Sequence, residues 1–315
     1  MAKYIVTGCA GFIGSHLSER LVRDGHEVVG IDAFTDYYDP ALKEANLAAL
    51  GGRDAFSLVR GDLVTLDLEP LVAGTDGVFH LAAQPGVRAS WMAFDQYLSR
   101  NLHATQSLFE AAAGAGVRVA WASSSSVYGS LDTFPTTETD ECRPISPYGV
   151  TKLACERLAY AYARSHGLEA CGLRYFTVYG PRQRPDMAFT RIARGLVSGG
   201  TFPVFGSGEQ SRDFTYVEDA VEATVAVLER GVPGTNYNVG GGEEATLNGV
   251  IGLFEELAGR RLDVQRQGQA VGDMSRTCAD TSRLRSDTGW SPRTALRDGI
   301  ARQLEWASQP TTTTS

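Results

Sequence analysis

The stretch Lys3–Asp32, KYIVTGCAGFIGSHLSERLVRDGHEVVGID, decides the fold. Its first residues, Lys3–Thr7, are rich in β-branched and aromatic side chains and predict a short strand. After a glycine-rich turn, apolar residues at helical spacing predict a helix over Ser15–Asp24. Gly25 ends that helix, and Glu27–Ile31 predicts a second strand. A strand, a helix and a second strand in this order predict a βαβ unit, in which the two strands pair in parallel.

The turn carries Gly8, Gly11 and Gly14 in the pattern G-x-x-G-x-x-G. In a dinucleotide-binding turn, the first glycine allows a tight bend, the second lets the backbone approach a pyrophosphate, and the third lets helix and sheet pack closely. The phosphates then lie at the helix N-terminus, where unpaired N–H groups and the helix dipole favour anions. Glycine triplets also occur in plain turns, so the context of strand, turn and helix carries the interpretation.

Asp32 ends the second predicted strand, about 20 residues after the turn, where a carboxylate can hold the ribose hydroxyls of a dinucleotide. On its own this aspartate could equally cap a loop. A carboxylate there would repel a 2′-phosphate, and neither Ala33 nor Phe34 offers a cation. The sequence therefore predicts NAD, and disfavours NADP.

Strands and helices alternate through the first part of the chain. Further strands are predicted at Phe56–Arg60, Gly77–Leu81, Val117–Ala122 and Ala170–Tyr175, with helices at Asp95–Ala115 and Pro147–His166. This alternation predicts an α/β fold with a Rossmann-like, doubly wound parallel sheet.

After Gly180, prolines and glycines interrupt the pattern, and helices are predicted at Asp219–Arg230 and Leu247–Leu257. We expect an NAD-binding domain over 1–180 that also takes back 215–240. A smaller mixed α/β substrate domain is expected over 181–214 and 241–307, followed by a disordered tail over 308–315.

The composition is acidic and argues against nucleic-acid binding. Lys and Arg number 29 and Asp and Glu 37, which gives a net charge of −8, whereas general nucleic-acid binders have a basic face. No apolar run approaches the roughly 18 residues that span a bilayer. The 5 cysteines form neither a CxxC nor a CxH pair, so we expect a reduced, cytoplasmic protein with no metal site.

Tyr148 and Lys152 are spaced i, i+4 at the start of a predicted helix, which places them on one helix face. A tyrosine hydroxyl normally keeps its proton at pH 7, and a neighbouring ammonium group favours the phenolate, which can act as a general base. Ser123–Ser126 follow the predicted strand Val117–Ala122, where strand ends line the ligand crevice of such sheets. The alternatives are an ordinary surface pair and a capped turn.

The segments TGCAGFIG, SSSSVYG, SPYGVTK and RYFTVYGPRQRPDM occur in this order. Together they resemble the extended short-chain dehydrogenase/reductase family of NAD-dependent nucleotide-sugar epimerases and dehydratases. The resemblance runs from about residue 3 to about residue 305. AAQPGVR (Ala82–Arg88) and FTVYGPRQRPDMA (Phe176–Ala188) are most similar to bacterial UDP-glucuronate 4-epimerases.

The resemblance implies roles for individual residues. Tyr148 would be the catalytic base, Lys152 its partner, and Ser124 the hydroxyl that shares the O4 proton of the sugar. The cofactor contacts would be Gly8, Gly11, Phe12, Ile13, Gly14, Asp32, Asp62, Leu63, Leu81, Ala82, Ala83, Gln84, Tyr148, Lys152, Tyr175 and Val178. The substrate contacts would be Arg88, Ser124, Ser125, Ser126, Tyr148, Thr177, Arg184, Val204, Phe205, Gln210, Arg212 and Asp273.

Three departures bear on the substrate. Dehydratases of the family carry Asp-Glu, and uronate decarboxylases Glu, at the positions of Ser125 and Ser126, where this chain has only hydroxyls. Thr177 stands where neutral-hexose epimerases usually have asparagine. Those relatives also carry an arginine shortly before Gly272-Asp273, which this chain lacks, so Arg212 is expected to neutralise more of the diphosphate.

The resemblance therefore implies 4-epimerisation of a UDP-sugar, with UDP-glucuronate favoured and a homodimer as the assembly. The alternatives are a UDP-glucose/UDP-galactose 4-epimerase and a UDP-glucuronate decarboxylase. A protein that only senses NAD is a further alternative, because this fold can serve binding alone. The tyrosine, lysine and serine set argues against a sensor, since a sensor needs no base.

Overall fold

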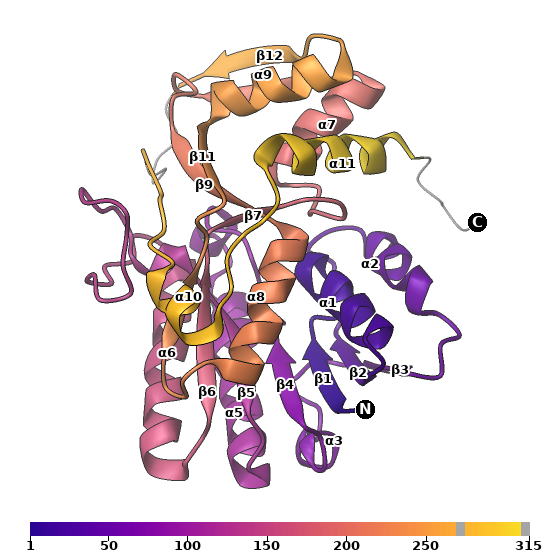
Figure 1. The fold of residues 1–315 in the computed structure, drawn as a ribbon, viewed down its shortest axis with the longest axis vertical. Coiled ribbons are helices and arrows are strands. Elements are labelled where there is room, and N and C mark those ends of the chain that lie inside the picture. Colours follow the sequence, from indigo (N-terminus) through magenta and orange to yellow (C-terminus); the bar gives the residue numbers. More distant parts are fainter. Residues whose placement is uncertain (269–274, 310–315) are drawn as a thin grey trace.

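The computed structural model describes residues 1–268 and 275–309 (Figure 1). Its centre is a sheet of seven parallel strands in the order β10-β6-β5-β4-β1-β2-β3. The bounds are β1 Lys3–Thr7, β2 Glu27–Asp32, β3 Phe56–Arg60, β4 Gly77–His80, β5 Val119–Ser124, β6 Ala170–Tyr175 and β10 Asn236–Val239. The strand order reverses next to β1, as in doubly wound folds, and the predicted fold class is confirmed.

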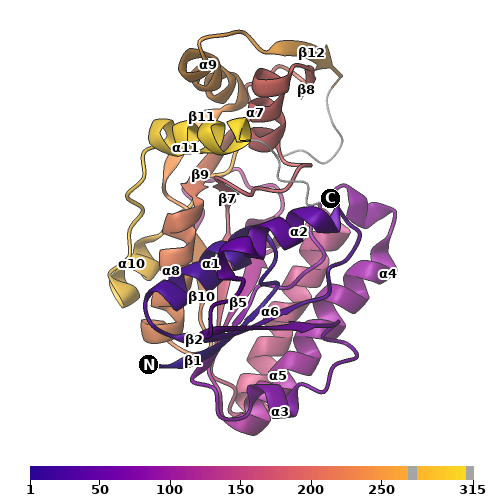
Figure 2. The same cartoon turned by 90° about the vertical axis from the view of Figure 1, so that its right-hand side faces the viewer.

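Helices cover both faces of this sheet, which is why β4 and β6 are buried along their whole length (Figure 2). One layer contains α1 (Phe12–Arg23) and α8 (Val217–Arg230), which pack on each other. The other contains α3 (Glu69–Val72), α5 (Ala104–Ala115) and α6 (Pro147–His166). The remaining helical segments on this half are α2 Pro40–Leu47, η1 Ala48–Leu50, η2 Ala89–Trp91, α4 Phe94–Tyr97, η3 Leu98–His103, η4 Ser125–Val127 and α10 Ser282–Thr288.

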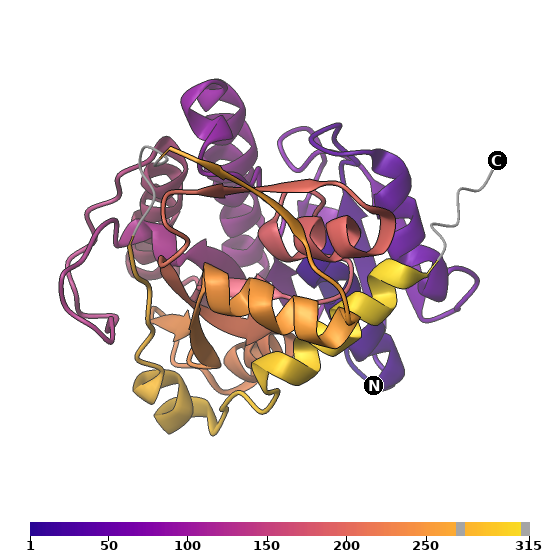
Figure 3. The ribbon, with the colours of Figure 1, turned by 90° about the horizontal axis from the view of Figure 1, so that it is seen from above.

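A smaller unit lies beyond the carboxyl ends of the central strands (Figures 1 and 3). It has a three-stranded sheet in the order β11-β9-β7 and a two-stranded sheet of β12 and β8. Its elements are β7 Thr177–Tyr179, α7 Ala188–Ser198, β8 Thr201–Phe205, β9 Ser211–Tyr216, β11 Glu243–Thr246, α9 Leu247–Ala258, β12 Asp263–Gln267 and α11 Leu296–Ser308. Helices α7, α9 and α11 pack against one another. Between these elements the chain returns to the central sheet as α8 and β10, so the crevice has a wall from each unit.

Several predicted boundaries differ from the structure; α8, for example, begins at Val217 and not at Asp219, and three further differences bear on the site. Helix α1 begins at Phe12, three residues before the predicted start, so the turn is shorter. Strand β5 runs over Val119–Ser124, since Ser123 and Ser124 pair with Arg174 and Tyr175 of β6 and continue the ladder. The predicted helix Asp95–Ala115 is divided into α4, a π-helical segment η3 and α5.

The π-helical segment η3 places one buried asparagine where it can fasten two other elements. The backbone N–H of Gln84 donates to Oδ1 of Asn101 at 2.6 Å, and Nδ2 of Asn101 donates to the carbonyl of Gln84 at 3.2 Å. The same Nδ2 donates to Oγ1 of Thr151 on α6 at 3.1 Å. Such wide turns are frequent at functional sites, and this one ties the loop after β4 to helix α6.

No helix in the described part of the chain is long and apolar enough to cross a membrane. Of the predicted tail over 308–315, Ser308 closes α11 and residues 310–315 lie outside the described residues.

Candidate active site

A cavity of about 470 Å³ lies where the carboxyl ends of the central strands meet the smaller unit. Every cofactor contact inferred from the sequence lines it, namely Gly8, Gly11, Phe12, Ile13, Gly14, Asp32, Asp62, Leu63, Leu81, Ala82, Ala83, Gln84, Tyr148, Lys152, Tyr175 and Val178. Ser124, Ser125, Ser126, Thr177, Arg184 and Arg212 line it as well. Chain segments far apart in sequence therefore converge on one cavity large enough for a small-molecule ligand.

The glycine turn leaves no room for a side chain at its first and third glycines. Gly8 has a φ of +70°, and a Cβ there would lie 2.8 Å from the backbone nitrogen of Ala82. A Cβ on Gly14 would lie 2.1 Å from the carbonyl oxygen of Gly8. Gly11 caps α1 without a side-chain hydrogen bond. The first residues of α1 line the cavity, so an anion bound there can accept hydrogen bonds from their N–H groups.

Asp32 is buried at the end of β2 and accepts three hydrogen bonds. Its Oδ1 accepts from Nζ of Lys43 at 2.9 Å and from the backbone N–H of Phe34 at 2.8 Å. Its Oδ2 accepts from the backbone N–H of Ala10 at 3.2 Å. Lys43 comes from α2 and also lines the cavity. The sequence argument considered only the residues next to Asp32 and missed this cation.

Helix α6 presents Tyr148 and Lys152 to the cavity. The helix starts at a clear signal, because Oγ of Ser146 accepts from the N–H of Gly149 at 3.1 Å and Pro147 occupies the first turn. Nζ of Lys152 donates to the carbonyl of Ala122 at 2.7 Å. The ring of Tyr148 meets Tyr97 edge to face, with centroids 6.2 Å apart. The hydrogen bond to Ala122 ties the ammonium group of Lys152 to the end of β5.

The serine run turns at the end of β5. Ser124 accepts from the N–H of Ser126 at 3.1 Å, which bends the chain into η4 and points the run at the cavity. Ser123 instead donates its hydroxyl to Oε1 of Glu156 at 2.7 Å. All four serines line the cavity, and the hydroxyls of Ser124, Ser125 and Ser126 are not bonded to Glu156 and can meet a ligand.

Other tyrosines that line the cavity are held in the neutral form. Burial raises the pKa of Tyr175, whose hydroxyl pairs with Oγ1 of Thr224 at 2.6 Å. Burial raises the pKa of Tyr38 to about 12, with a further contribution from the charge of Asp32. Burial also raises the pKa of Tyr37. Nζ of Lys43 lies 5.6 Å from the ring centroid of Tyr38, but the raised pKa of Tyr38 opposes the phenolate form. Tyr148 has Lys152 one helical turn away on the same face of α6, so it is the best placed to act as a base.

The wall on the side of the smaller unit is basic and rich in hydroxyls. Arg184 is bonded through Nε and Nη2 to the carboxylate of Asp186, each at 3.0 Å. Nη1 of Arg212 donates to the carbonyl of Ser211 at 2.8 Å. Thr277 is 8% exposed, and among the described residues its Oγ1 has no hydrogen-bond partner. A buried hydroxyl that lines a cavity and has no protein hydrogen-bond partner among the described residues is suited to bind a ligand oxygen.

Four proposed substrate contacts lie outside the residues that line the cavity. Arg88 is exposed and its guanidinium lies over the ring of Phe205 at 4.6 Å. Val204 is fully buried, and Nε2 of Gln210 donates to the carbonyl of Phe205 at 3.4 Å. These four residues stay predictions as substrate contacts, because the lining of the cavity does not include them. Asp273 lies outside the described residues.

Sequence reasoning missed Lys43, Asn101 and Thr277. Lys43 and Thr277 line the cavity, and Asn101 holds a residue that does. Lys43 is 11 residues after Asp32 on a separate helix, and Thr277 follows the two-stranded sheet. No local motif marks these positions. Asn101 offered no clear sequence signal either, because Thr105, one helical turn further on, is a second polar residue on the same side.

A family model, sequence relatives and solved structures with bound NAD match this chain. The model of the NAD dependent epimerase/dehydratase family matches residues 4–240. An "Uncharacterized UDP-glucose epimerase YtcB" of Bacillus subtilis is 42% identical, covering 97% of this chain and 98% of the relative. The crystal structure of UDP-glucuronic acid 4-epimerase from Bacillus cereus with UDP-glucuronic acid and NAD has a TM-score of 0.93 at 39% identity, covering 97% of this chain and 98% of that chain. A structure of MoeE5 with UDP-glucuronic acid and NAD has a TM-score of 0.87 at 43% identity, covering 96% and 98%.

Proposed function

Because the chain belongs to the NAD dependent epimerase/dehydratase family, we propose that it is an isomerase that inverts C4 of a UDP-sugar, with UDP-glucuronate and UDP-galacturonate as the pair. One observation carries the proposal. Tyr148, Lys152 and Ser124 line one cavity, together with the hydroxyl groups of Ser125, Ser126 and Thr177. Relatives that bind UDP-glucuronic acid share the fold over nearly the whole chain.

The cavity fits NAD. Gly8 and Gly14 exclude a Cβ next to the start of α1, which leaves room and N–H donors for a pyrophosphate. Asp32 lies at the end of β2, where it can accept from the hydroxyls of the adenine ribose. Lys152 would hold the other ribose. Bound there, NAD takes up a hydride from the sugar and returns it, which is chemistry that side chains cannot supply.

The side chains at the end of β5 handle the proton. Tyr148, as phenolate, accepts the proton from O4 of the sugar while C4 is oxidised to a ketone, and Lys152 stabilises the negative charge. Ser124 shares the O4 proton. The keto sugar then turns about its diphosphate link, which Arg212 and Thr277 hold. Reduction from the opposite face, with the proton returned by Tyr148, gives the C4 epimer.

A uronate poses a further requirement, because a 4-keto uronate is a β-keto acid that tends to lose CO₂. The enzyme must keep the C6 carboxylate turned out of line with the carbonyl π-system. Ser125, Ser126 and Thr177 offer hydroxyl donors beside Ser124, and Arg184 offers a cation on the facing wall. We assign these four residues to the carboxylate.

The cavity disfavours dehydration and decarboxylation. Among the described residues that line it, the carboxylates are Asp32 and Asp62, which follow β2 and β3 at one end of the sheet. The proposed reaction centre lies at β5 and β6, three or more strands away. No carboxylate of the described lining is therefore placed to act as the acid or base that elimination requires.

A UDP-glucose/UDP-galactose 4-epimerase is the second candidate. The relative from Bacillus subtilis is described as a UDP-glucose epimerase, and MoeE5 has also been solved with UDP-glucose and NAD. Thr177 and the hydroxyl-rich wall favour the uronate, since they supply donors that a neutral C6 hydroxymethyl group does not need.

The test is incubation of the purified protein with UDP-glucuronate and no added cofactor, followed by NMR of the product. We expect UDP-galacturonate. A UDP-pentose with CO₂ would establish a decarboxylase instead. Turnover of UDP-glucose alone would establish the hexose epimerase, and tightly held NAD without any turnover would leave an NAD-binding sensor.

We propose that 1–180 together with 215–240 bind NAD and that 181–214 together with 241–307 bind the UDP-sugar. At the edges of this division, β7 and the end of β9 belong to the sheet of the smaller unit, and α10 packs on α8 and β10 of the central half. We further propose a homodimer formed by helices α5 and α6, which pack side by side. Val150 and Tyr160 of α6 are 48% and 64% exposed, although both are large and apolar or aromatic. Light scattering should give twice the monomer mass, and Val150→Arg combined with Tyr160→Arg should give monomers.

A further inference from the structure

Helix α6 carries a buried carboxylate on the face that bears the proposed catalytic pair. Tyr148, Lys152 and Glu156 follow one another at four-residue intervals, so they lie on one side of the helix. Lys152 is 3% exposed and Glu156 is 5% exposed. The proposed mechanism gives Glu156 no task.

The partners of this face are consecutive residues of β5. Lys152 donates to the carbonyl of Ala122 at 2.7 Å, and Ser123 donates to Oε1 of Glu156 at 2.7 Å. The next residue is Ser124, which lines the cavity. Two hydrogen bonds, one helical turn apart, therefore fix α6 against the strand end that carries Ser124.

The charge of Glu156 is balanced by Arg174 of the neighbouring strand β6. Nε and Nη2 of Arg174 donate to the two carboxylate oxygens at 2.8 and 2.7 Å. Nη1 donates to the hydroxyl of Tyr128 at 2.8 Å and to the carbonyl of Glu138 at 3.2 Å. This bidentate pair joins α6, β5 and β6 in one geometry.

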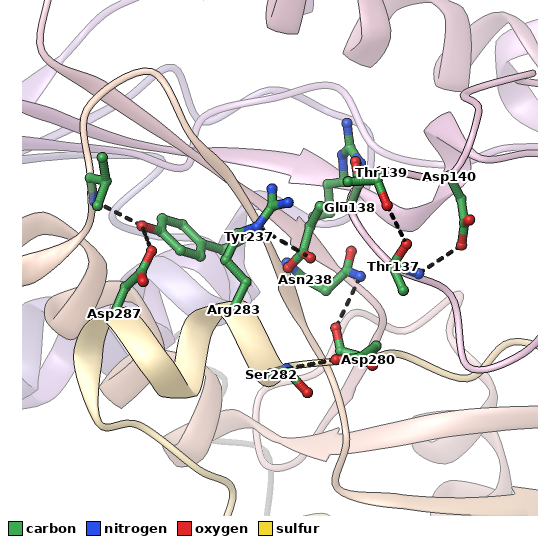
Figure 4. Close-up of polar contacts among 12 residues, drawn as sticks. Thr137, Glu138, Thr139, Asp140, Tyr237, Asn238, Asp280, Ser282, Arg283 and Asp287 are labelled. Carbon is green, nitrogen blue, oxygen red and sulfur yellow. Dashed lines mark hydrogen bonds and ion pairs between the residues drawn. The ribbon is translucent and has the colours of Figure 1, made fainter.

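The network continues from Tyr128 to Asn238 of β10, the strand with which the chain returns to the central sheet. The hydroxyl of Tyr128 donates to Oδ1 of Asn238 at 2.6 Å. Figure 4 shows Asn238 between Glu138 and Asp280: its N–H donates to Oε1 of Glu138 at 2.9 Å, and its Nδ2 donates to the carbonyl of Asp280 at 3.1 Å. Asp280 lies three residues after Thr277, so the network ends beside the proposed diphosphate wall.

A buried ion pair is weak evidence for stability, because the loss of hydration offsets much of the attraction between the charges. What such a pair supplies is one defined arrangement. We propose that Glu156 and Arg174 are positioning residues, which hold α6 in the register that aligns Tyr148 and Lys152 with Ser124. This inference rests on the proposed function for the roles of those three residues.

The first test is Glu156→Gln, which keeps the shape but puts an amide against Arg174. Because small displacements of a reacting group cost up to about 100-fold in rate, we expect kcat to fall about 10- to 100-fold. KM for UDP-glucuronate should change less than about 3-fold and NAD should stay bound, since neither ligand touches Glu156. Amide hydrogen exchange across residues 147–156 should become faster, a readout that requires no turnover.

The matched control is Thr288→Val. Thr288 is buried and donates to the carbonyl of Leu284 in α10, away from α6. Its loss should lower stability while leaving kcat and the exchange of 147–156 unchanged. If Glu156→Gln does not fold, Ser123→Ala removes the bond between Glu156 and β5 and should lower kcat about 3- to 10-fold. Because Ser123 also lines the cavity, KM for UDP-glucuronate must stay unchanged for the effect to count as positioning.

An unchanged kcat in a folded Glu156→Gln or Ser123→Ala enzyme, or equal effects in Thr288→Val, would overturn the positioning role. Failure of the wild-type protein to act on UDP-glucuronate would instead reject the proposed function. In that case the exchange of 147–156 still decides whether Glu156 fixes α6.

Discussion

Gly14→Ala adds one methyl group to the glycine turn, and it should weaken NAD binding more than it destabilises the fold. In Gly14→Ala the new Cβ lies 2.1 Å from the carbonyl oxygen of Gly8, whereas ordinary contact begins at 3.4 Å, so the turn must move by about 1.3 Å (3.4 − 2.1). Overpacking of this kind costs about 1–3 kcal/mol, and the higher helix propensity of alanine offsets about 1 kcal/mol. Folding should therefore lose no more than about 2 kcal/mol.

Cofactor binding should suffer more. A backbone N–H that donates to a phosphate is worth about 1.5–3 kcal/mol, so displacing one donor should raise the Kd for NAD about 10- to 150-fold. The measurement is the NAD content of the purified protein after gel filtration, with calorimetric titration of NAD into stripped protein. Thermal unfolding reports the stability in parallel.

Gly252→Ala is the control, because a Cβ on Gly252 in α9 meets nothing within 4 Å. That variant should gain about 0.5–1 kcal/mol and keep its NAD. If Gly14→Ala also retains stoichiometric NAD with an unchanged Kd, the turn does not hold the pyrophosphate and the cofactor assignment at α1 is wrong.

Three further predictions use the same protein. Tyr148→Phe should lower kcat by about 10²- to 10⁴-fold while NAD and UDP-glucuronate still bind; near-normal turnover would reject Tyr148 as the base. Thr277→Val should raise the KM for UDP-glucuronate about 10-fold at unchanged kcat, because a hydrogen bond to a charged oxygen is lost, and an unaltered KM would place the diphosphate elsewhere. Burial lowers the pKa of His80 from 6.5 to about 3, so below pH 6.5 the unfolded chain takes up a proton that the folded chain does not. The free energy of unfolding is therefore highest above pH 6.5 in this respect and falls as the pH is lowered toward 3. Between pH 6.5 and 5, the free energy of unfolding measured in urea should fall by about 2 kcal/mol less in His80→Gln than in the wild-type protein. An equal fall in both proteins would show that His80 is not the group responsible.

Helix α6 was predictable from the sequence with both ends, Pro147–His166, because its signals are local. Ser146 and Pro147 start it, and Gly167 takes the left-handed conformation that ends it. The glycine turn was predictable for the same reason: the groups that need it lie within a few residues. Parallel strands bring their carboxyl ends together, so residues at predicted strand ends were expected to share one crevice.

Contacts between distant segments could not be predicted in this way. Strand β5 extends through Ser124 because β6 offers Tyr175 as a partner, and serine itself has no strong strand preference. The predicted helix Asp95–Ala115 contains a π-helical segment, and from it the amide of Asn101 reaches both Gln84 and Thr151. These features depend on contacts with residues far away in the sequence, which the local sequence does not reveal.

Lys43 changes the argument for NAD without reversing its result. The sequence predicts that Asp32 repels a 2′-phosphate, because no cation stands next to it in the chain. In the structure, Nζ of Lys43 lies 2.9 Å from Oδ1 of Asp32. To bind that phosphate, Lys43 would have to leave Asp32, and the buried carboxylate would then lose its partner, which costs several kcal/mol. The hydroxyls of NAD require no such exchange, because they can donate to Asp32 while Lys43 stays in place. The selectivity therefore resides in the pair, and Lys43→Met should weaken NAD binding without improving NADP binding.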